Sequence, residues 1–500
     1  MHDLLPNIPS QLNAIQQSLV YFMPEVSLAM LFVFVLVTDI IFGKNSERLC
    51  RTVACAGILL VVFKDLQQLG FVLNGNQQIL FSGMLLLNHT SLVFKFIIDI
   101  LTFILLLYFG WDDKLKSHRK RLADLYSITI GSVLGLHLMV MAINLLSIYL
   151  AIEMVSIASY LMVAYRSENA FSTEAGLKYV LFGAASSAIM LYGISLLYGF
   201  SGSLNLFDAS TVQHLLQANA VGVSFAIILV LTGIGFKLSF VPMHFWVPDV
   251  YQGSATPVTT YLSTLPKIAA FGLLINFLTP FLFFAKFTSF DFRLYLSVIS
   301  IITMIAGNFA AIMQNNIKRM LAYSSIGHTG FALMAIITFT SQGVSYLTYY
   351  LAVYGLANIA ALALATYFTN VTGAEDLDDY KGLSTKYPVA SVCFVIILIS
   401  LAGLPVTAGF TGKLFVFSAV YAVYQQSHDV WLLLLMVTGA LTTVVSLFYY
   451  IKIPLYLFLK KADNDTNPAI KFQNIIILSI IMAITLLLLG IFPNWLLWYL

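Results

Sequence analysis

Four lysines and one glutamate lie within stretches that are otherwise apolar enough to cross a membrane: Lys178, Lys237, Lys267, Lys413 and Glu153. A charge at the centre of a membrane helix costs roughly 2.5–3.5 kcal/mol on insertion scales, so such residues usually face a polar pathway instead of lipid. An apolar surrounding favours the neutral form of a lysine, which makes its proton easier to give up. These residues therefore predict a proton relay inside a membrane protein.

The composition supports a membrane location for the whole chain. Of 500 residues, 60% are hydrophobic and only 9% are charged, and the mean hydropathy is +0.91. Soluble domains carry about 25% charged residues, so no large soluble domain is expected. The 25 Lys and Arg barely exceed the 22 Asp and Glu, which argues against a nucleic-acid partner.

The sequence indicates no cofactor held by this chain. Its three cysteines, Cys50, Cys55 and Cys393, have neither metal-ligand spacing nor the pattern of a disulfide framework. There is no Walker phosphate loop, no dinucleotide-binding GxGxxG after a strand and no catalytic triad. The first residues, MHDLLPNIPSQLNAIQQ, lack the basic region of a cleaved signal peptide. Any coupled nucleotide or redox chemistry is therefore expected on other chains.

Apolar runs of about 18–25 residues, each long enough to span the bilayer, predict an all-α polytopic membrane protein with about fourteen transmembrane helices. Lys64 and Asp65 interrupt the second run, and with Asp39 they are expected near an interface or against another subunit. The runs are 20–42, 52–73, 92–110, 125–143, 145–165, 174–199, 221–246, 255–279, 292–313, 321–340, 345–370, 389–423, 430–457 and 473–497.

The basic residues of the loops predict the orientation. If both termini lie outside, the loops facing inside carry sixteen Lys and Arg and the opposite loops carry only Lys286 and Arg293. This is a strong positive-inside bias. It predicts both termini on the periplasmic side of a bacterial inner membrane, although a plastid membrane stays open.

Two of the predicted helices contain residues that break helical hydrogen bonding. Residues 231–251 hold Pro242 and Pro248, and residues 399–421 hold Gly403 and Pro405. Each break falls in the fourth helix of a possible five-helix unit, helices 4–8 and 9–13. Because five is odd, the two units would be inverted repeats, and paired broken helices in such repeats indicate a transport site. The expected divisions are 1–120, 121–280, 281–458 and 459–500, namely an N-terminal three-helix segment, two repeats and a last helix.

Lys237 and Lys267 are expected near mid-membrane. Lys237 comes just before the break at Pro242, and Lys267 is central in the eighth helix. His244 follows Lys237 by seven residues, or two helical turns, so the two would share a face unless the break rotates it. The near-neutral pKa of histidine suits it to a relay between the two lysines.

Lys413 lies in the later part of the twelfth helix, which runs from inside to outside. It is therefore expected nearer the outer face than Lys237. A route from Lys237 through His244 and Lys267 to Lys413 would carry protons sideways and then outward.

Glu153 and Lys178 fall on neighbouring helices, where opposite charges could pair. The helix boundaries place Glu153 nearer the outer face and Lys178 nearer the inner one, which leaves either a boundary error or a bridging water.

The remaining polar residues of the helices are less specific. His328 is a candidate relay group and His137 is a weaker one. Lys95 and Asp99 are four residues apart, which predicts an ion pair within one helix. The acidic run EDLDDYKGL at 375–383 is expected to be a solvated inner loop, with contact to a partner also possible.

The stretch FKLSFVPMHFWVPDVYQGSATPVTTYLSTLPKIAAF at 236–271 resembles the signature of the antiporter-like subunits of respiratory complex I. The part PDVYQGSATPVT is similar to the N-type branch, whereas the L and M branches more usually read PDAH there. A lysine at 413 also suits N or L better than M, and the lack of a long extension after the last helix argues against L. One departure is Ser254-Ala255, where the family commonly has Ala-Pro.

The resemblance implies a proton-translocating subunit of NADH-quinone oxidoreductase. It implies that NADH, flavin, iron–sulfur clusters and quinone bind other chains, and that this chain contacts other membrane subunits, flanking antiporter-like ones among them. It assigns Glu153 and Lys178 as a pair, Lys237 and Lys267 as central lysines, His244 as a connecting residue and Lys413 as the exit group.

Three other functions stay open. A subunit of a multi-subunit cation/proton antiporter would share the fold without the redox partner. An independent solute carrier would need a substrate-sized cavity at the midplane, and a structural scaffold would tolerate replacement of the lysines.

Overall fold

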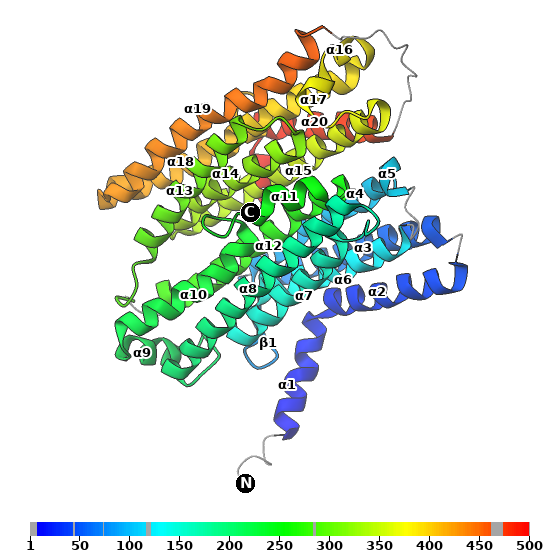
Figure 1. Cartoon of the computed structure of the whole chain (residues 1–500). Helices are drawn as coiled ribbons and strands as arrows, with labels where there is room; N and C mark the ends of the chain where they lie inside the picture. The colour runs from blue at the N-terminus through cyan, green and yellow to red at the C-terminus, as the bar shows by residue number, and fades with distance from the viewer. Residues whose placement is uncertain are drawn as a thin grey trace.

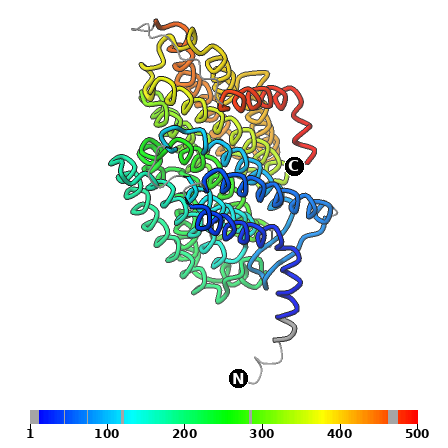
Figure 2. The backbone as a smooth tube through the Cα atoms, turned by 90° about the vertical axis from the view of Figure 1, so that its right-hand side faces the viewer, coloured from blue at the N-terminus to red at the C-terminus, as the bar shows by residue number. Residues whose placement is uncertain are grey.

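The computed structural model describes residues 8–43, 46–73, 75–116, 122–283, 287–461 and 474–499. The long helices lie side by side with their axes roughly aligned (Figure 1), and the N-terminal α1 (Ile8–Tyr21) extends away from the bundle in both views (Figures 1 and 2). The helices from α1 to α12 occupy one half of the bundle in Figure 1, and those from α13 onward occupy the other. The expected all-α polytopic fold is confirmed.

Twelve helices of the described ranges are long and apolar enough to cross a membrane. They are α2 (Met23–Phe42), α4 (His89–Phe109), α6 (Ala123–Met141), α7 (Leu145–Val163), α8 (Ala170–Ser201), α10 (Ala220–Leu238), α12 (Thr256–Phe283), α13 (Phe292–Ile312), α14 (Ile317–Ile337), α15 (Ser341–Thr372), α19 (Val430–Phe458) and α20 (Asn474–Ile491). With the more polar α3 (Ser46–Leu73) and the broken pair α17 (Pro388–Ala402) and α18 (Ala408–Ser427), they account for the fourteen predicted segments.

Shorter elements connect these helices. Residues Gln78–Leu80 (β1) and Leu85–Leu87 (β2) form an antiparallel hairpin with Ile79 opposite Leu86, which the sequence analysis did not predict. The other short elements are α5 (Asp113–Lys116), α9 (Ala209–Gln217), η3 (Leu377–Tyr380), α16 (Leu383–Lys386) and α21 (Asn494–Leu497).

Both predicted helix breaks are present. The first separates α10 from α11 (Trp246–Gly253), and the second separates α17 (Pro388–Ala402) from α18 (Ala408–Ser427). The first contains a cis peptide bond before Pro242, and Ser239, the residue after the end of α10, has a left-handed conformation. The second begins at Gly403, whose φ of +82° favours glycine, and a Cβ there would lie 2.7 Å from Cδ of Lys413. Each break therefore lies next to one of the singled-out lysines.

The helix starts follow from the sequence. Seven helices begin after an Asn or Asp whose side chain accepts a hydrogen bond from a backbone N–H of the first turn, as N-caps do. These residues are Asn88, Asn144, Asn169, Asn219, Asp291, Asn316 and Asp429. Small residues then allow close helix packing. A Cβ on Gly330 of α14 would lie 2.7 Å from the backbone nitrogen of Met304 on α13, so these two helices touch backbone to backbone.

Candidate functional site: a row of buried lysines at two broken helices

Lys237 lies in the last turn of α10, directly before the first break, and is 2% exposed. Its ammonium lies 5.8–6.0 Å from the ring centroids of Tyr160, Tyr179 and Phe236, within the range of cation–π attraction. Among the described residues its Nζ donates no hydrogen bond. The charged side chain that interacts with it electrostatically is Glu153.

Lys267 of α12 is also 2% exposed, and it donates to oxygens of α14. Its Nζ lies 3.0 Å from Oγ of Ser325, 3.1 Å from the Ser325 carbonyl oxygen and 3.3 Å from Oγ1 of Thr329. The Thr329 hydroxyl also lies 2.9 Å from the carbonyl oxygen of Leu238, the last residue of α10. A single hydroxyl therefore connects Lys267 to the helix end that carries Lys237.

His328 stands between Lys267 and the second break. Its Nδ1 lies 2.7 Å from the Tyr350 hydroxyl and its Nε2 lies 3.0 Å from the Tyr450 hydroxyl. It interacts electrostatically with both Lys267 and Lys413. A small cavity of about 10 Å³ is lined by His328, Lys413 and Tyr350, among others.

Lys413 lies in the second turn of α18, and its side chain reaches back to the break. Its Nζ donates to the carbonyl oxygen of Ala402, the last residue of α17, at 2.7 Å. The C-terminal end of a helix carries partial negative charge, so this position favours a cation. The ammonium therefore lies at the break between α17 and α18.

The three lysines share one property. Lys237, Lys267 and Lys413 are all buried, and none forms an ion pair with a carboxylate in the part of the chain that the structure describes. Hydroxyls, carbonyl oxygens and aromatic rings surround them instead. An ammonium in such a surrounding can release its proton without breaking an ion pair.

His244 lies outside this connection. It belongs to the turn between α10 and α11, and its ring centroid lies 4.4 Å from that of Phe245. Its Nδ1 has no hydrogen-bond partner among the described residues. The helix ends at Leu238, so the two-turn spacing that would place it on the face of Lys237 does not apply. Ser325, His328 and Thr329 of α14 occupy the connecting position instead.

The expected pairing of Glu153 with Lys178 is wrong. Glu153 accepts a hydrogen bond from the Ser187 hydroxyl, whereas Lys178 pairs with Glu174 at 2.8 Å and with Asp249 of α11 at 2.7 Å. Lys178 lies two turns after α8 begins, and its side chain is 38% exposed. The two residues therefore lie at different levels of α8: Glu153 lies beside Ser187, nine residues further along the helix than Lys178.

A second correction concerns the N-terminal helices. Lys95 pairs with Glu25 of α2 at 2.7 Å and with Asp65 of α3 at 2.8 Å, and not with Asp99 on its own helix. Asp99 contacts His137 of α6. Asp65 is 1% exposed and lies inside the bundle. Long side chains on four helices converge there, so contacts between helices replace the expected contact within one helix.

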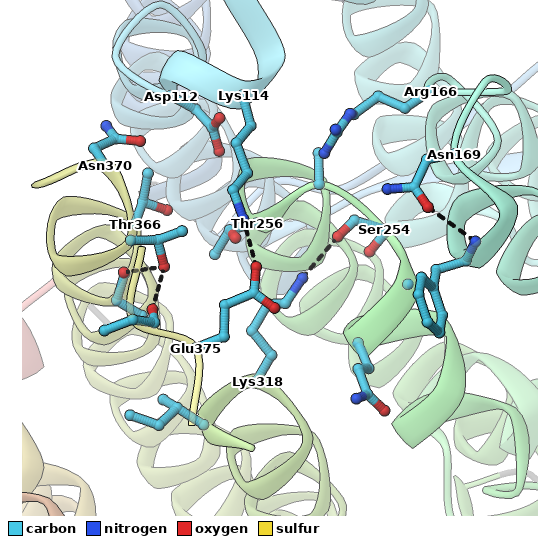
Figure 3. A pocket seen from close by; sticks show the side chains of 18 of the residues that line it. Asp112, Lys114, Arg166, Asn169, Ser254, Thr256, Lys318, Thr366, Asn370 and Glu375 are labelled. Atoms are coloured by element: carbon cyan, nitrogen blue, oxygen red, sulfur yellow. Dashed lines mark hydrogen bonds and ion pairs between the residues drawn. The ribbon is translucent and has the colours of Figure 1, made fainter. Parts of the chain in front are cut away.

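A polar cavity of about 310 Å³ lies at the end of the bundle that carries the basic loops (Figure 3). In it, Lys114 pairs with Glu375 at 2.5 Å and Lys318 donates to the Ser254 carbonyl oxygen at 3.0 Å. Burial raises the pKa of Asp112. Burial also acts to raise the pKa of Glu375, but Lys114 and Lys318 lower it by more, so the net shift is downward.

Two polar stripes lead from this cavity toward Lys267. On α12, Thr256, Thr260, Ser263 and Lys267 are spaced four, three and four residues apart, which places them on one face. On α15 the facing residues include Thr366, which hydrogen-bonds Tyr108 of α4, and then Asn358 and Tyr354. Asn358 donates to the Ser263 hydroxyl at 2.7 Å, and the Tyr354 ring lies 4.9 Å from that of His328.

Sequence reasoning missed the residues that connect the lysines. Ser325 and Thr329 are four residues apart and flank His328 in SSIGHTGF, so a polar face within an apolar helix was a usable signal. Glu174, four residues before Lys178, was also a visible partner. Asp249 was not, since its contact with Lys178 depends on how α11 turns after the break.

The chain has relatives that match nearly all of its length. The profile of the NADH:quinone oxidoreductase/Mrp antiporter transmembrane family matches residues 142–443. NADH-quinone oxidoreductase subunit N 2 of Chloroherpeton thalassium is 36% identical over 466 residues, covering 92% of this chain and 89% of the relative. Subunit N of Chlorobium chlorochromatii is 35% identical over 486 residues, covering 96% of this chain and 93% of that one.

Solved structures share the fold. A chain of respiratory complex I from Thermus thermophilus with bound aureothin has a TM-score of 0.77 and 27% identity, with 95% of this chain and 98% of that chain covered. A chain of the Mrp complex from Dietzia sp. has a TM-score of 0.79 at 19% identity, with 95% of each chain covered, which is a likeness of fold alone. The family profile spans more than half of this chain, and it includes the broken helices and all three buried lysines. The chain therefore belongs to the NADH:quinone oxidoreductase/Mrp antiporter family of polytopic membrane subunits.

Proposed function

We propose that this chain conducts protons across the membrane as a subunit of an NADH-quinone oxidoreductase, with electron transfer taking place on other chains. The observation that carries the proposal is the row of three buried lysines, none of which has a carboxylate partner among the described residues, at and between the two helix breaks. The full-length relatives at more than 30% identity, which are named as subunits of quinone oxidoreductases, support the redox partner.

The relay runs from Lys237 to Lys413 through α14. Nζ of Lys237 has no hydrogen-bond partner among the described residues, so the transfer from Lys237 toward Lys267 requires water. On the Lys267 side the proton meets the Thr329 hydroxyl, which contacts Nζ of Lys267 and the carbonyl oxygen at the end of α10. His328, with its ring between two tyrosine hydroxyls, carries it onward to Lys413. Each lysine alternates between a charged and a neutral state, which the absence of a paired carboxylate permits.

Coupling acts through Glu153. Its carboxylate interacts electrostatically with Lys237, so a change in the charge of Glu153 changes how tightly Lys237 holds its proton. The ion pair of Lys178 with Asp249 holds α11, the segment directly after the first break, against α8. These two contacts replace the Glu153–Lys178 pair in the mechanism.

Protons enter from the inner side, through the cavity of Figure 3 and the polar stripes of α12 and α15. The positive-inside bias supports this orientation, with both termini outside, in a bacterial inner membrane. The hydroxyls of Thr260 and Ser263 and the amide of Asn358 offer hydrogen bonds to water along the way.

Neighbouring membrane subunits cover the outward face of α8. Phe171, Leu177 and Tyr192 are 57–72% exposed, and the half-exposed Glu174 and Lys178 lie on the same helix. Charged groups are costly against lipid, so a protein neighbour suits this face better than acyl chains do. We infer that flanking antiporter-like subunits are among these neighbours, and that flavin and iron–sulfur clusters lie on other chains. Co-purification of flavin and iron–sulfur subunits separates this assembly from a cation/proton antiporter, which would lack them.

The decisive experiment replaces Lys237 by Ala in membrane vesicles and measures NADH-driven proton pumping together with quinone reduction. We expect at least about a tenfold loss of pumping, since the chemical step through Lys237 is removed. Lys116→Ala, at a 45% exposed position, is the matched control and retains both activities. An unchanged ratio of protons pumped to NADH oxidised in Lys237→Ala would refute the relay.

A further inference from the structure

A second cluster of buried ionisable groups lies in the N-terminal helices, apart from the lysine row. It consists of Glu25 (α2), Asp65 (α3), Lys95 and Asp99 (α4) and His137 (α6), each at most 1% exposed. We call these five residues the N-terminal cluster. The lysine relay does not use them.

The N-terminal cluster has more acids than bases. Three carboxyl groups face one lysine and one histidine, so full ionisation leaves a net charge of −1 in an apolar surrounding. Uncompensated buried charge is strongly unfavourable. One added proton makes the cluster neutral, so charge balance favours the binding of a single proton.

The geometry offers that proton a shared position. Nδ1 of His137 lies 3.2 Å from Oε1 of Glu25, and Nε2 lies 3.0 Å from Oδ1 of Asp99. An imidazolium donates to both carboxylates, whereas a neutral ring donates to one and accepts from the other when that carboxyl is protonated. The proton can therefore move along Asp99, His137 and Glu25 without displacement of the heavy atoms.

Unpartnered oxygens show where a proton would be held. Oε2 of Glu25, Oδ2 of Asp65 and Oδ2 of Asp99 are buried and accept no hydrogen bond from the described residues. A buried carboxylate oxygen without a donor costs free energy, and protonation lowers that cost because it removes the charge of the carboxylate.

A metal ion suits the cluster less well. Ligand atoms of Asp65, Asp99 and His137 all lie within 4.8 Å of one another. Both ring nitrogens already face carboxylate oxygens, however, and the Lys95 ammonium touches Glu25 and Asp65 at 2.7 and 2.8 Å. A second cation would meet that ammonium at close range, whereas a proton on a carboxyl would not.

The other ionisable residues of the packed helices leave this count unchanged. Lys64 donates to the Ser27 hydroxyl and forms no ion pair with the cluster, and α12, which packs on α4 and α6, carries only Lys267. Glu153 of α7, which packs on α6, accepts a hydrogen bond from the Ser187 hydroxyl of α8. The remaining Asp, Glu, His, Lys and Arg residues of α2, α3, α4 and α6 lie at the far ends of the helices or at the start of α4, and they are Asp39, Glu47, Arg48, Arg51, His89 and Asp124.

The cluster has a polar connection to the surface on the hairpin side. Gln68 of α3, which is partly exposed, accepts from Lys95 at 3.5 Å and donates to the Tyr21 carbonyl oxygen at 2.8 Å. His137 lies four residues before the end of α6, about 6 Å along the helix axis at 1.5 Å per residue. The cluster is thus close to the membrane surface opposite the cavity of Figure 3.

We propose that the N-terminal cluster is a second proton-binding site, which holds one exchangeable proton shared along Asp99, His137 and Glu25 and exchanges it through Gln68 with the hairpin side. It is a separate site from the lysine row. The carboxyl groups of the cluster bind one proton, whereas the lysines of the row transfer protons from one to the next.

Infrared difference spectroscopy of the purified complex, titrated across neutral pH in H₂O and D₂O, tests the proposal. A protonated carboxyl gives a C=O stretching band that shifts in D₂O. We expect the native complex to show such a band at near-neutral pH with the amplitude of one carboxyl group. Asp65→Asn and Asp99→Asn each leave two acids and two bases, so each variant should lose the whole band.

Controls separate this proposal from others. Asp65→Glu retains the acid, and Asp208→Asn removes an exposed carboxyl elsewhere, so both should keep the band. Lys237→Ala should also keep the band, so the experiment tests the proton-binding site separately from the proposed lysine relay. A band of full amplitude in both Asn variants overturns the proposal, and so does a Na⁺-dependent spectrum in place of the carboxyl band. The two Asn variants change different helices. If one of them fails to assemble, the spectrum of the other still tests the proposal.

Discussion

The lysine row and the N-terminal cluster bury cations in opposite ways. Lys237, Lys267 and Lys413 have no carboxylate partner among the described residues and rely on rings, hydroxyls and carbonyl oxygens. Lys95, by contrast, touches two carboxylates and is 0% exposed. Both arrangements place charge in an apolar bundle, but they respond differently to the loss of a proton.

The two regions differ in the charge that stays buried after a lysine loses its proton. Removing the proton from Lys267 leaves a neutral amine among neutral groups, which buried surroundings favour. Neutralising Lys95 would leave carboxylates without a cation, which buried surroundings penalise. The row therefore suits transfer of protons, and the cluster suits a fixed cation that organises acids around it.

The largest expected effect compares the same substitution in both regions. Lys95→Met strips Glu25 and Asp65 of their partner and should destabilise the subunit by about 3–5 kcal/mol, as breaking buried ion pairs does. Lys267→Met leaves no buried charge behind, so it should assemble normally and lose proton pumping. Native gel electrophoresis of the complex and vesicle pumping measure the two outcomes.

The double variant Lys95→Met with Asp65→Asn is the control. It removes one of the two carboxylates that Lys95→Met leaves without a cation, so it should assemble better than Lys95→Met alone. Equal assembly of Lys95→Met and Lys267→Met would contradict the distinction between paired and unpaired cations.

The sequence predicted the row far better than the cluster. Prolines and glycines next to Lys237 and Lys413 are local signals, because they break a helix wherever it packs. The free-energy cost of placing a lysine in the middle of a membrane helix can also be recognised from the sequence of that helix alone. Consequently the helices, both breaks and the buried positions of these lysines were predicted correctly.

The cluster could not be predicted in that way. Its contacts join α2, α3, α4 and α6, and their formation depends on rotations of the helices that no single helix specifies. The one local pattern, Lys95 four residues before Asp99, indicated the wrong partner. The same limit explains Lys178, whose contact with Asp249 depends on the course of the chain after the break.

A smaller effect is expected at the hydroxyl that joins the two halves of the row. Thr329→Val removes the oxygen shared by Nζ of Lys267 and the Leu238 carbonyl while keeping the shape of the side chain. A hydrogen bond of about 1–1.5 kcal/mol corresponds to a roughly five- to tenfold slower transfer. Thr329→Ser keeps the hydroxyl and should pump at nearly the native rate. Equal pumping by the Val and Ser variants would exclude Thr329 from the route.

The smallest effect is expected where an ion pair reaches solvent, at Lys114 and Glu375 in the inner cavity. Both side chains are 46% exposed, so screening limits the pair to at most about 1 kcal/mol. The lowered pKa of Glu375 means that this stabilisation is present above the unfolded-state pKa of about 4.3 and is lost as the pH falls through the folded value. The thermal stability of Glu375→Gln should therefore differ slightly from native at pH 7, and the difference should disappear only as the pH falls below the lowered pKa of Glu375. A loss comparable to that of Lys95→Met would show that this exposed pair behaves like a buried one, and it would remove the distinction between the two kinds of site.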